Sequence, residues 1–381
     1  MSDIPPYRRT KIIRAAFRPG QRILMISDIH GHDSVFRALL KKADFTEDDA
    51  LVIVGDLLEK GAESLRVIRT LMSLCRTHQV YVLLGNMDVF TIHRLLSDDP
   101  VWRNRLFDKA QDMIRWWGGC LLDEMCRELD IPLTSGLDRI ATVRRLREHF
   151  APELAFLTGL PTILDTPTIT FVHGGLPHLR LDELENTLNE PFLKNDDFLA
   201  KGLSFEKYLA VGHWPTVLYR DRMMDMSPLI LRDRRIICLD GGCGVKHSGQ
   251  LNCVILPDAH SEDFSFIWAD DLPHVRAAGY QEASSDFTYI RFHDRNVDIL
   301  ERGPEFARVL YHGKTVRVPV SALDEENPGR LNTDMTDYRL PVAPGDEMSL
   351  IQRFGDEIYV RKNNILGWYQ GDYEYVADNE R

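Results

Sequence analysis

The sequence lacks the features that would tie it to a membrane or to an oxidising compartment. No run of about 18 apolar residues occurs in the chain, so we expect no transmembrane helix. The N-terminal stretch carries basic residues but not the apolar segment of a signal peptide. The six cysteines form no Cys-x-x-Cys pair, which indicates reduced thiols rather than a disulfide framework. The sequence therefore predicts a cytoplasmic protein.

The chain also lacks an excess of basic residues. It has 46 Lys and Arg against 58 Asp and Glu, and the net charge of −12 is spread along its length. This balance argues against partners such as a nucleic-acid polymer or an anionic membrane surface. A phosphorylated substrate stays compatible with it, because bound metal ions can supply local positive charge. The length of 381 residues allows two or three domains.

Polar side chains of metal-ligand type follow three apolar segments near the start of the chain. Residues 22–27, 50–54 and 80–84 read as strands, and the first is followed by Asp28 and His30, the second by Asp56 and the third by Asn86. The steps from Asp28 to Asp56 to Asn86 are 28 and 30 residues, the length of one strand–helix–strand unit.

The carboxyl ends of parallel strands meet at one edge of a sheet. We therefore expect Asp28, His30, Asp56 and Asn86 to converge and to bind a divalent metal ion, since carboxylate, imidazole and amide oxygen suit such ions. A single loop of this kind would be an ordinary turn. Three in register favour a metal site over that alternative.

Helical patterns lie between and after these strands. Residues 35–43 and 64–77 carry apolar side chains at helical spacing. The pattern stays helical from about residue 91 to 160, where we expect a helical cap beside the metal-binding edge. Trp116 and Trp117 in this cap are expected to be core residues, because aromatic side chains dominate protein cores.

Two later strands end at a histidine. Residues 169–172 run into His173-Gly174-Gly175, and residues 208–211 run into Gly212-His213. A single histidine at a strand end is usually structural. Two of them, in a chain that already carries half of a metal site, are better interpreted as its missing nitrogen ligands.

The composition changes after residue 257. Residues 258–285 are acidic and irregular and are expected to be a linker or an excursion. Two β-rich segments follow, at 286–325 and 340–381. When they are laid over each other, Arg302 meets Arg353, Val309 meets Val360, and the turn His312-Gly313 meets Asn363-Asn364. This weak repeat of about 50 residues predicts two copies of a small antiparallel barrel.

Together the strand-end motifs resemble the calcineurin-like metallophosphoesterases. The nearest pattern is the phosphoprotein-phosphatase type, which includes bacterial Ser/Thr phosphatases and diadenosine tetraphosphatases. The motifs are D-x-H-G at 28–31, G-D-x4-G at 55–61, G-N-x-D at 85–88, H-G-G at 173–175 and G-H at 212–213. The resemblance implies an α/β fold, a four-layer α/β/β/α sandwich, over residues 1–257.

By the same resemblance, two divalent metal ions bind at this site. Asp28 and His30 would hold one ion, Asn86, His173 and His213 the other, and Asp56 would bridge both. Manganese is the expected metal, with iron, zinc or nickel as alternatives. The implied reaction is hydrolysis of a phosphate ester by a hydroxide that bridges the two ions.

One departure from the family pattern concerns proton donation. The family usually has a histidine after the asparagine of the third motif, and that histidine protonates the leaving group. Met87 stands here, and a thioether cannot donate a proton. His32 is a candidate substitute acid, with a plain surface histidine as the alternative. A reaction with a good leaving group would need no acid at all.

A second departure concerns the binding of phosphate. Lys60 and Lys194 stand near positions where the family usually has arginines, and lysine lacks the bidentate fork of arginine. For Lys194 a solvated surface position is an equal alternative. Trp214 follows the G-H motif, where a small hydroxyl residue is commoner, and an indole there favours a flat substrate such as a nucleotide.

The segment from Gly367 to Tyr373 resembles the end of bacterial SH3-type modules, with the pattern G-W-x-x-x-x-Y. The C-terminal region is therefore expected to be a small all-β, SH3-like part. Its role is open between packing on the catalytic domain, self-association and binding of a protein partner.

Three functions follow from these observations. The first is a phosphoesterase with two metal ions that acts on a phosphoprotein or a small phosphorylated molecule. The second is a phosphodiesterase or dinucleoside polyphosphate hydrolase, which Met87 and Trp214 favour. The third is a catalytically weak metal-binding scaffold that acts through its SH3-like segments.

Overall fold

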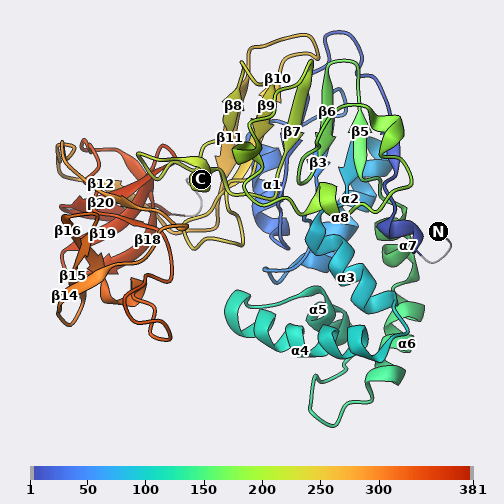
Figure 1. The fold of residues 1–381 in the computed structure, drawn as a ribbon, viewed down its shortest axis with the longest axis horizontal. Coiled ribbons are helices and arrows are strands. Elements are labelled where there is room, and N and C mark those ends of the chain that lie inside the picture. The colour runs from blue at the N-terminus through green and yellow to red at the C-terminus, as the bar shows by residue number, and fades with distance from the viewer. Residues whose placement is uncertain (1–3, 378–381) are drawn as a thin grey trace. The chain divides into compact units, whose positions relative to one another are not determined.

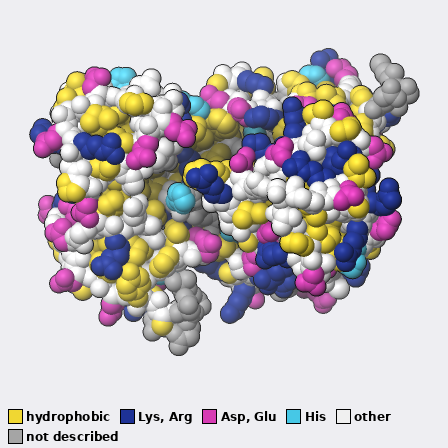
Figure 2. Space-filling view, turned by 90° about the horizontal axis from the view of Figure 1, so that it is seen from below, with side chains coloured by type: hydrophobic (Ala, Val, Ile, Leu, Met, Phe, Trp, Pro, Cys, Tyr) yellow, Lys and Arg dark blue, Asp and Glu magenta, His cyan; other side chains and the backbone are white. Residues whose placement is uncertain are grey.

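The computed structural model describes residues 4–377, which form two compact units. Within the described range, residues 4–215 and 228–270 build the first unit, and residues 216–227 and 271–377 build the second. Across residues 4–377, none of the helices combines the length and apolar character that crossing a membrane requires. All six cysteines are free thiols. Acidic and basic side chains are interspersed over the face in Figure 2, so the charge does not gather in one patch there.

The first unit contains a five-stranded sheet whose strands β2, β3 and β4 precede the first three motifs, and Figure 1 shows part of it around β3, β10 and β11. Its strand order is β11-β10-β2-β3-β4. The bounds are β2 (Ile23–Ile26), β3 (Ala50–Val54), β4 (Gln79–Leu83), β10 (Leu251–Leu256) and β11 (Ser265–Ala269). Strands β2, β3 and β4 run parallel. Their carboxyl ends therefore share one edge, as the strand–helix–strand spacing predicts.

A six-stranded sheet carries the two histidine motifs. Its order is β1-β5-β6-β7-β9-β8. The bounds are β1 (Ile12–Arg14), β5 (Ile163–Asp165), β6 (Ile169–Val172), β7 (Tyr208–Val211), β8 (Leu229–Leu231) and β9 (Ile236–Cys238). Strands β6, β7 and β9 run parallel, so the loops after β6 and β7 also lie at one edge.

The two sheets face each other across one apolar core. Successive side chains of a strand point to opposite faces. Ile23 and Met25 of β2 accordingly join a core with Leu164 of the six-stranded sheet. Leu24 and Ile26 join the core on the other face, where α1 (Asp33–Lys42) packs on β10 and β11, and α2 (Ser64–Thr77) packs on β4. The unit is the mixed α/β sandwich that the motifs predict.

Five helices form the region expected to be helical from about residue 91 to 160. They are α3 (Asn86–Leu96), α4 (Pro100–Trp117), α5 (Leu121–Glu128), α6 (Arg139–His149) and α7 (Ala151–Gly159). The expectation that Trp116 and Trp117 are core residues is wrong, because they are 63% and 39% exposed. They occupy the last turn of α4, beyond the buried stripe that ends at Met113.

Short helices complete both units. They are η1 (Pro6–Arg8), η2 (Leu181–Glu183), α8 (Glu190–Leu193), η3 (Phe198–Lys201), η4 (Thr216–Tyr219) and η5 (Val320–Ala322), where η marks a 3₁₀ helix. The peptide N–H of Gly174 donates to the carbonyl of Phe192 over 2.7 Å. Helix α8 is therefore tied directly to the loop that carries His173.

The second unit consists of three small sheets. One has the order β20-β19-β18-β12-β21, one pairs β13 with β17, and one has the order β14-β15-β16. The bounds are β12 (His274–Ala277), β13 (Tyr289–Ile290), β14 (Asp298–Arg302), β15 (Phe306–Tyr311), β16 (Lys314–Pro319), β17 (Met335–Thr336), β18 (Glu347–Phe354), β19 (Glu357–Lys362), β20 (Ile365–Gln370) and β21 (Tyr373–Tyr375).

The internal repeat is visible in the backbone of these sheets. The turns His312-Gly313 and Asn363-Asn364 join β15 to β16 and β19 to β20, and all four residues have positive φ, as tight hairpin turns require. A register shift lies between Ile299 and Glu301 in β14, and another between Leu350 and Gln352 in β18. Both pairs differ by 51 residues, as Val309 and Val360 do.

The residue that carries the SH3-type resemblance is structural. Trp368 is 5% exposed, and its indole N–H donates to the carbonyl of Thr336 over 2.8 Å. It therefore fills the core of the second unit rather than offering a ring to a ligand. The assignment of the segments 286–325 and 340–381 to SH3-like repeats stays a prediction.

Residues 258–285, expected to be a linker or excursion, contain two strands. β11 pairs with β10 at the edge of the five-stranded sheet, and β12 pairs with β18 and β21. The side chains of β11 are partly or fully exposed. Four of the five residues of β11 are apolar, so the strand carries a signal of its own. The acidic residues on both sides of it led instead to the prediction of a linker.

Part of the second unit comes from the middle of the chain. Residues 216–227 leave the first unit just after the G-H motif, at Pro215, and return to it at Pro228. The peptide N–H of Met226 donates to the carbonyl of Asn364, and the N–H of Leu366 donates to the carbonyl of Met224, each over 2.9 Å. This excursion had no signal in the sequence.

Candidate metal centre

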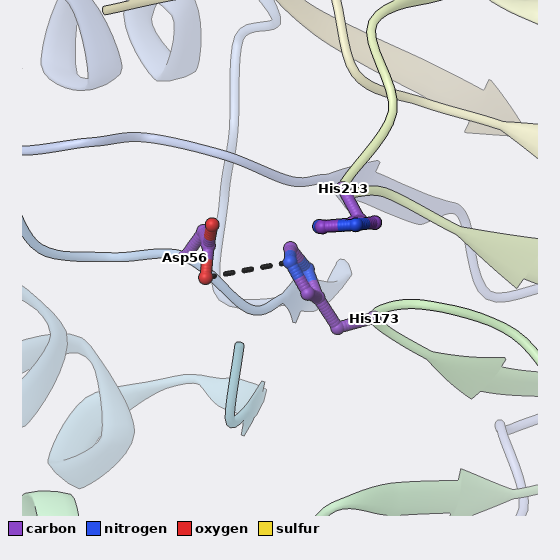
Figure 3. Close-up of side chains that lie close together, drawn as sticks. All are labelled: Asp56, His173 and His213. Carbon is purple, nitrogen blue, oxygen red and sulfur yellow. Dashed lines mark ion pairs between the residues drawn. The ribbon is translucent and has the colours of Figure 1, made fainter. Parts of the chain in front are cut away.

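Two groups of possible metal ligands meet at Asp56. One group is Asp28, His30 and Asp56, and the other is Asp56, His173 and His213. Within each group the ligand atoms lie within 4.8 Å of one another. Figure 3 shows the second group, in which a carboxylate oxygen of Asp56 points at the imidazole of His173 and the His213 ring lies next to it. The structure thus brings together Asp28, His30, Asp56, His173 and His213, and their role as metal ligands stays a prediction.

The shared position of Asp56 is supported by distances on both sides. Its Oδ2 lies 3.6 Å from Nε2 of His30, and its Oδ1 lies 3.3 Å from Nε2 of His173. Asn86, the first residue of α3, places its Oδ1 3.2 Å from the same nitrogen of His173. The structure thus places Asn86 beside the second group, where the resemblance expects it.

The backbone is strained at these loops. Asp28, His30, Asp56 and His213 have φ values of 57°, 47°, 50° and 69°. Residues other than glycine rarely adopt positive φ, and a sparsely populated backbone conformation costs about 1–3 kcal/mol. Strain at four candidate ligands of one site indicates that the loops are shaped for function.

Two glycines allow the loops to approach closely. A Cβ atom on Gly85 would lie 2.1 Å from Oδ1 of Asp56, and one on Gly212 would lie 2.4 Å from Oδ2 of Asp28. Neither position has room for a side chain. The glycines in the G-N-x-D and G-H motifs are therefore required by space next to the carboxylates.

Backbone carbonyls orient two of the histidines. Nδ1 of His173 lies 2.8 Å from the carbonyl oxygen of Val54, and Nδ1 of His30 lies 3.1 Å from that of Leu58. Each Nδ1–H donates to its carbonyl, which leaves the lone pair on Nε2 for the centre. This is the arrangement that metal-binding histidines require.

The electrostatics of the centre are unbalanced without a cation. Burial raises the pKa of Asp28 to about 6, and burial together with the Lys60 ammonium group lowers the pKa of His30 to about 3. Burial lowers the pKa of His173, but the carboxylates of Asp56 and Asp28 outweigh it and raise that pKa to about 10. Burial also raises the pKa of Asp56, but His173 and His30 hold it well below its usual range. The carboxylates of Asp56 and Asp28 therefore favour positive charge at Nε2 of His173, which either a proton or a metal ion can supply.

The residues fit a pair of divalent metal ions. Oδ1 of Asp28 is buried and has no hydrogen-bond partner, which is costly unless a cation or another donor faces it. Carboxylate oxygen, amide oxygen and imidazole nitrogen are ligands that manganese, iron, zinc and nickel accept. One carboxylate shared by two ligand groups can serve two cations.

The candidate catalytic residues lie around this centre. Nζ of Lys60 is 3.3 Å from Nε2 of His30, so its charge points into the site. Nδ1 of His32 lies 2.8 Å from the carbonyl oxygen of His30, which places the ring directly beside a ligand loop. Lys194 does not reach the ligands directly, because its ammonium group pairs with Asp196 at 2.9 Å.

Met87 contributes its backbone rather than its side chain. Its peptide N–H donates to Oδ1 of Asp56 over 2.8 Å. Its side chain is half-buried and packs against the main hydrophobic core. Trp214 is also half-buried, with its ring centroid 6.3 Å from that of His213.

Two acidic residues that support the site were not singled out by sequence reasoning. Asp196 accepts a hydrogen bond at 2.8 Å from Nε2 of His213, and thereby orients the third histidine. Asp88 is buried and accepts the peptide N–H groups of Leu57 and Gly85, which joins the second and third motifs. The sequence did contain a signal for Asp88, which is the last residue of the G-N-x-D motif. For Asp196 the sequence contained no signal except that it lies close to Lys194.

The fold and this cluster define a metal-dependent phosphoester hydrolase. The family model described as calcineurin-like phosphoesterase matches residues 21–242, which is more than half of the chain. The protein belongs to this family. The matched segment begins just before β2 and ends just after β9, so it includes every candidate metal ligand.

Curated relatives carry the name symmetrical bis(5'-nucleosyl)-tetraphosphatase. One from Buchnera aphidicola is 36% identical over 100 residues, covering 24% of this chain and 35% of the relative. One from Salmonella paratyphi B is 27% identical over 236 residues, covering 51% of this chain and 80% of the relative. A solved protein serine/threonine phosphatase from Saccharomyces cerevisiae is 12% identical with a TM-score of 0.42, covering 70% of this chain and 86% of that one.

Proposed function

We propose that the protein hydrolyses a phosphoanhydride bond of a dinucleoside polyphosphate at two divalent metal ions, of which manganese is the first choice. The observation that carries the proposal is the position of Asp56 between both ligand groups. Asp28, His30 and Asp56 would hold one ion, and Asp56, Asn86, His173 and His213 the other. When bound, such a pair activates water as the nucleophile and neutralises charge on the phosphoryl group.

Lys60 supplies further positive charge beside the first ligand group. Its ammonium group lies 3.3 Å from Nε2 of His30. Because lysine acts as a compact point charge, it attracts a phosphate oxygen without imposing the planar geometry of an arginine fork. A flexible polyphosphate chain, which offers many oxygens, suits this kind of recognition.

The absence of an acid at position 87 favours an anhydride over a serine or threonine ester. In either reaction water attacks phosphorus, and the bond from phosphorus to the leaving oxygen breaks with its electron pair on that oxygen. A leaving nucleotide is stable as an anion and needs no proton, whereas a leaving alkoxide does. Met87 cannot donate a proton, and its side chain packs on the core. The names of the curated relatives support the same substrate class.

His32 would assist this reaction as a proton donor for poorer leaving groups. Its Nδ1–H is held by the carbonyl of His30, which leaves Nε2 as the nitrogen that exchanges protons with a substrate or water. Lys194 would act through Asp196 and His213 rather than on the substrate. Both roles are minor beside that of the metal pair.

Purified full-length protein with Mn²⁺ tests the proposal. We expect it to hydrolyse diadenosine tetraphosphate, and to do so at least tenfold faster than a phosphoserine peptide. Asp56→Asn removes the charge shared by both ligand groups, and we expect it to lower kcat at least a hundredfold. Equal rates for Asp56→Asn and wild type would refute the metal mechanism. A faster rate on the phosphoserine peptide would refute the substrate class and favour a phosphomonoesterase.

A further inference from the structure

A hollow lined mainly by apolar atoms begins at the candidate metal ligand Asn86 and runs along α3. Its empty space is about 440 Å³ when the open solvent at its mouth is included, but the centres of water-sized molecules can occupy only about 80 Å³ of it. Phe90 and His93 also line it. These positions follow Asn86 by four and seven residues, so they lie on the same face of the helix. At 1.5 Å per residue, His93 is roughly 10 Å along α3 from the metal ligand.

The far end of the hollow is aromatic. His93 and Trp102 of α4 line it together, with ring centroids 4.7 Å apart and planes at 68°. The phenol of Tyr7 lies 3.0 Å from Nδ1 of His93, so the imidazole is held from a second side. The guanidinium group of Arg105 lies 5.0 Å from the centroid of Trp102. The two rings are therefore kept in place before any ligand binds.

The surroundings of the imidazole at this end favour its neutral form. Burial, together with the charge of Arg8, lowers the pKa of His93. A neutral imidazole next to an indole offers π-surface and one hydrogen-bond donor or acceptor. This chemistry suits a flat heteroaromatic ring, and it lacks the positive charge that attracts a phosphate group.

One ion pair stands among these apolar walls. Nη2 of Arg8 lies 3.3 Å from Oε2 of Glu190, the first residue of α8. The two side chains are 26% and 45% exposed, and they share one contact, so both keep unused hydrogen-bonding capacity. A carboxylate accepts hydrogen bonds from paired hydroxyl groups, and a guanidinium group donates to phosphate oxygens. Helix α8 is tied to the His173 loop through Gly174, which keeps Glu190 in register with the metal centre.

We propose that this hollow and its open mouth bind the nucleoside part of the substrate. The base stacks against Trp102 and His93, the ribose hydroxyl groups donate to Glu190, and the adjoining phosphate reaches the ligand group at Asn86. The inference rests on the proposed function, because it specifies the substrate of the same centre. A mostly apolar pocket with few polar groups is the usual form of a small-molecule site. A peptide would instead need an open groove.

The test measures binding of adenosine diphosphate and of pyrophosphate to the full-length Mn²⁺ protein by calorimetry. The variant is Trp102→Ala, and the matched control is Trp116→Ala, which removes an exposed indole from the same helix. Stacking a base on an aromatic side chain strengthens binding about 5- to 150-fold. We expect wild type and Trp116→Ala to prefer adenosine diphosphate over pyrophosphate by about tenfold or more. Trp102→Ala should lose most of this preference.

Glu190→Gln gives a second measurement that does not depend on the tryptophan variant. Wild type should bind adenosine diphosphate more tightly than its 2',3'-dideoxy analogue, by about tenfold for hydrogen bonds to a charged group. Glu190→Gln should bring this ratio close to one. Trp102→Ala should leave the ratio of the two nucleotides above one.

Two outcomes overturn the inference. One is equal affinity of the wild-type protein for adenosine diphosphate and pyrophosphate. The other is an equal loss of preference in Trp102→Ala and Trp116→Ala. Failure of the proposed function looks different, because selective binding of the nucleotide would then persist without hydrolysis of diadenosine tetraphosphate.

Discussion

Replacing Asp196 by asparagine tests how the tertiary structure completes the metal centre. The carboxylate accepts a hydrogen bond from Nε2 of His213 at 2.8 Å and pairs with Lys194 at 2.9 Å. Loss of the partner that orients a metal-binding histidine costs about 10- to 100-fold in metal affinity. The Asp196 side chain is 52% exposed, and water screens its charge. We therefore expect a loss at the lower end of this range, with Mn²⁺ binding about tenfold weaker, or about 1.4 kcal/mol.

The assay is a titration of metal-free protein with Mn²⁺ against a chelating indicator. Only one of the two binding steps should weaken in Asp196→Asn, because His213 belongs to one ligand group and Asp28 and His30 to the other. Asp197→Asn is the matched control, since Asp197 is the exposed next residue and asparagine tolerates its positive φ. Two unchanged steps in Asp196→Asn, or equal losses in both variants, would refute the reasoning.

Three further predictions follow from particular contacts. Burial raises the pKa of Glu124 from 4.5 to about 7. The unfolded chain therefore loses this proton at a lower pH than the folded protein does. As the pH rises from 4.5 to about 7, the free energy of unfolding of the wild-type protein falls. In urea unfolding, the free energy of unfolding of Glu124→Gln relative to that of wild type should rise by about 2–3 kcal/mol between pH 5 and pH 8. A difference that does not change with pH would contradict this prediction. Gly85→Ala places a methyl group 2.1 Å from Asp56 and should lower Mn²⁺-dependent activity at least a hundredfold, whereas Gly136→Ala, with no atom within 4 Å, should match wild type. Met87→His adds a proton donor and should raise hydrolysis of a phosphoserine peptide about tenfold or more relative to diadenosine tetraphosphate; an unchanged ratio would mean that no acid is needed there.

Much of the site could be predicted because its signals are local. Each candidate ligand lies within four residues of the end of an apolar strand, and this depends only on residues close together in the chain. Strands β2, β3 and β4 begin and end within one residue of the expected ranges. The parallel order of the three strands then brings Asp28, Asp56 and Asn86 to one edge.

Other features could not be predicted because they depend on residues far apart in the chain. Asp196 meets His213 across 17 residues, and Asp88 meets the peptide group of Leu57 across 31. Neither contact follows a helical or strand period. The excursion at residues 216–227 was missed for a related reason, since it is stabilised by hydrogen bonds to the distant residues Asn364 and Leu366.

The sequence by itself determined the types of ligand, the strands that present them, and the absence of a proton donor at position 87. Short-range order suffices for these, because a strand end and its glycine are encoded within a few residues. Only the tertiary structure decided that His173 and His213, from a second sheet, face Asp56 of the first. The apolar core between the two sheets is the physical reason. Alternate side chains of β2 are buried against the facing sheet, and this packing fixes which strand ends of the two sheets lie next to each other.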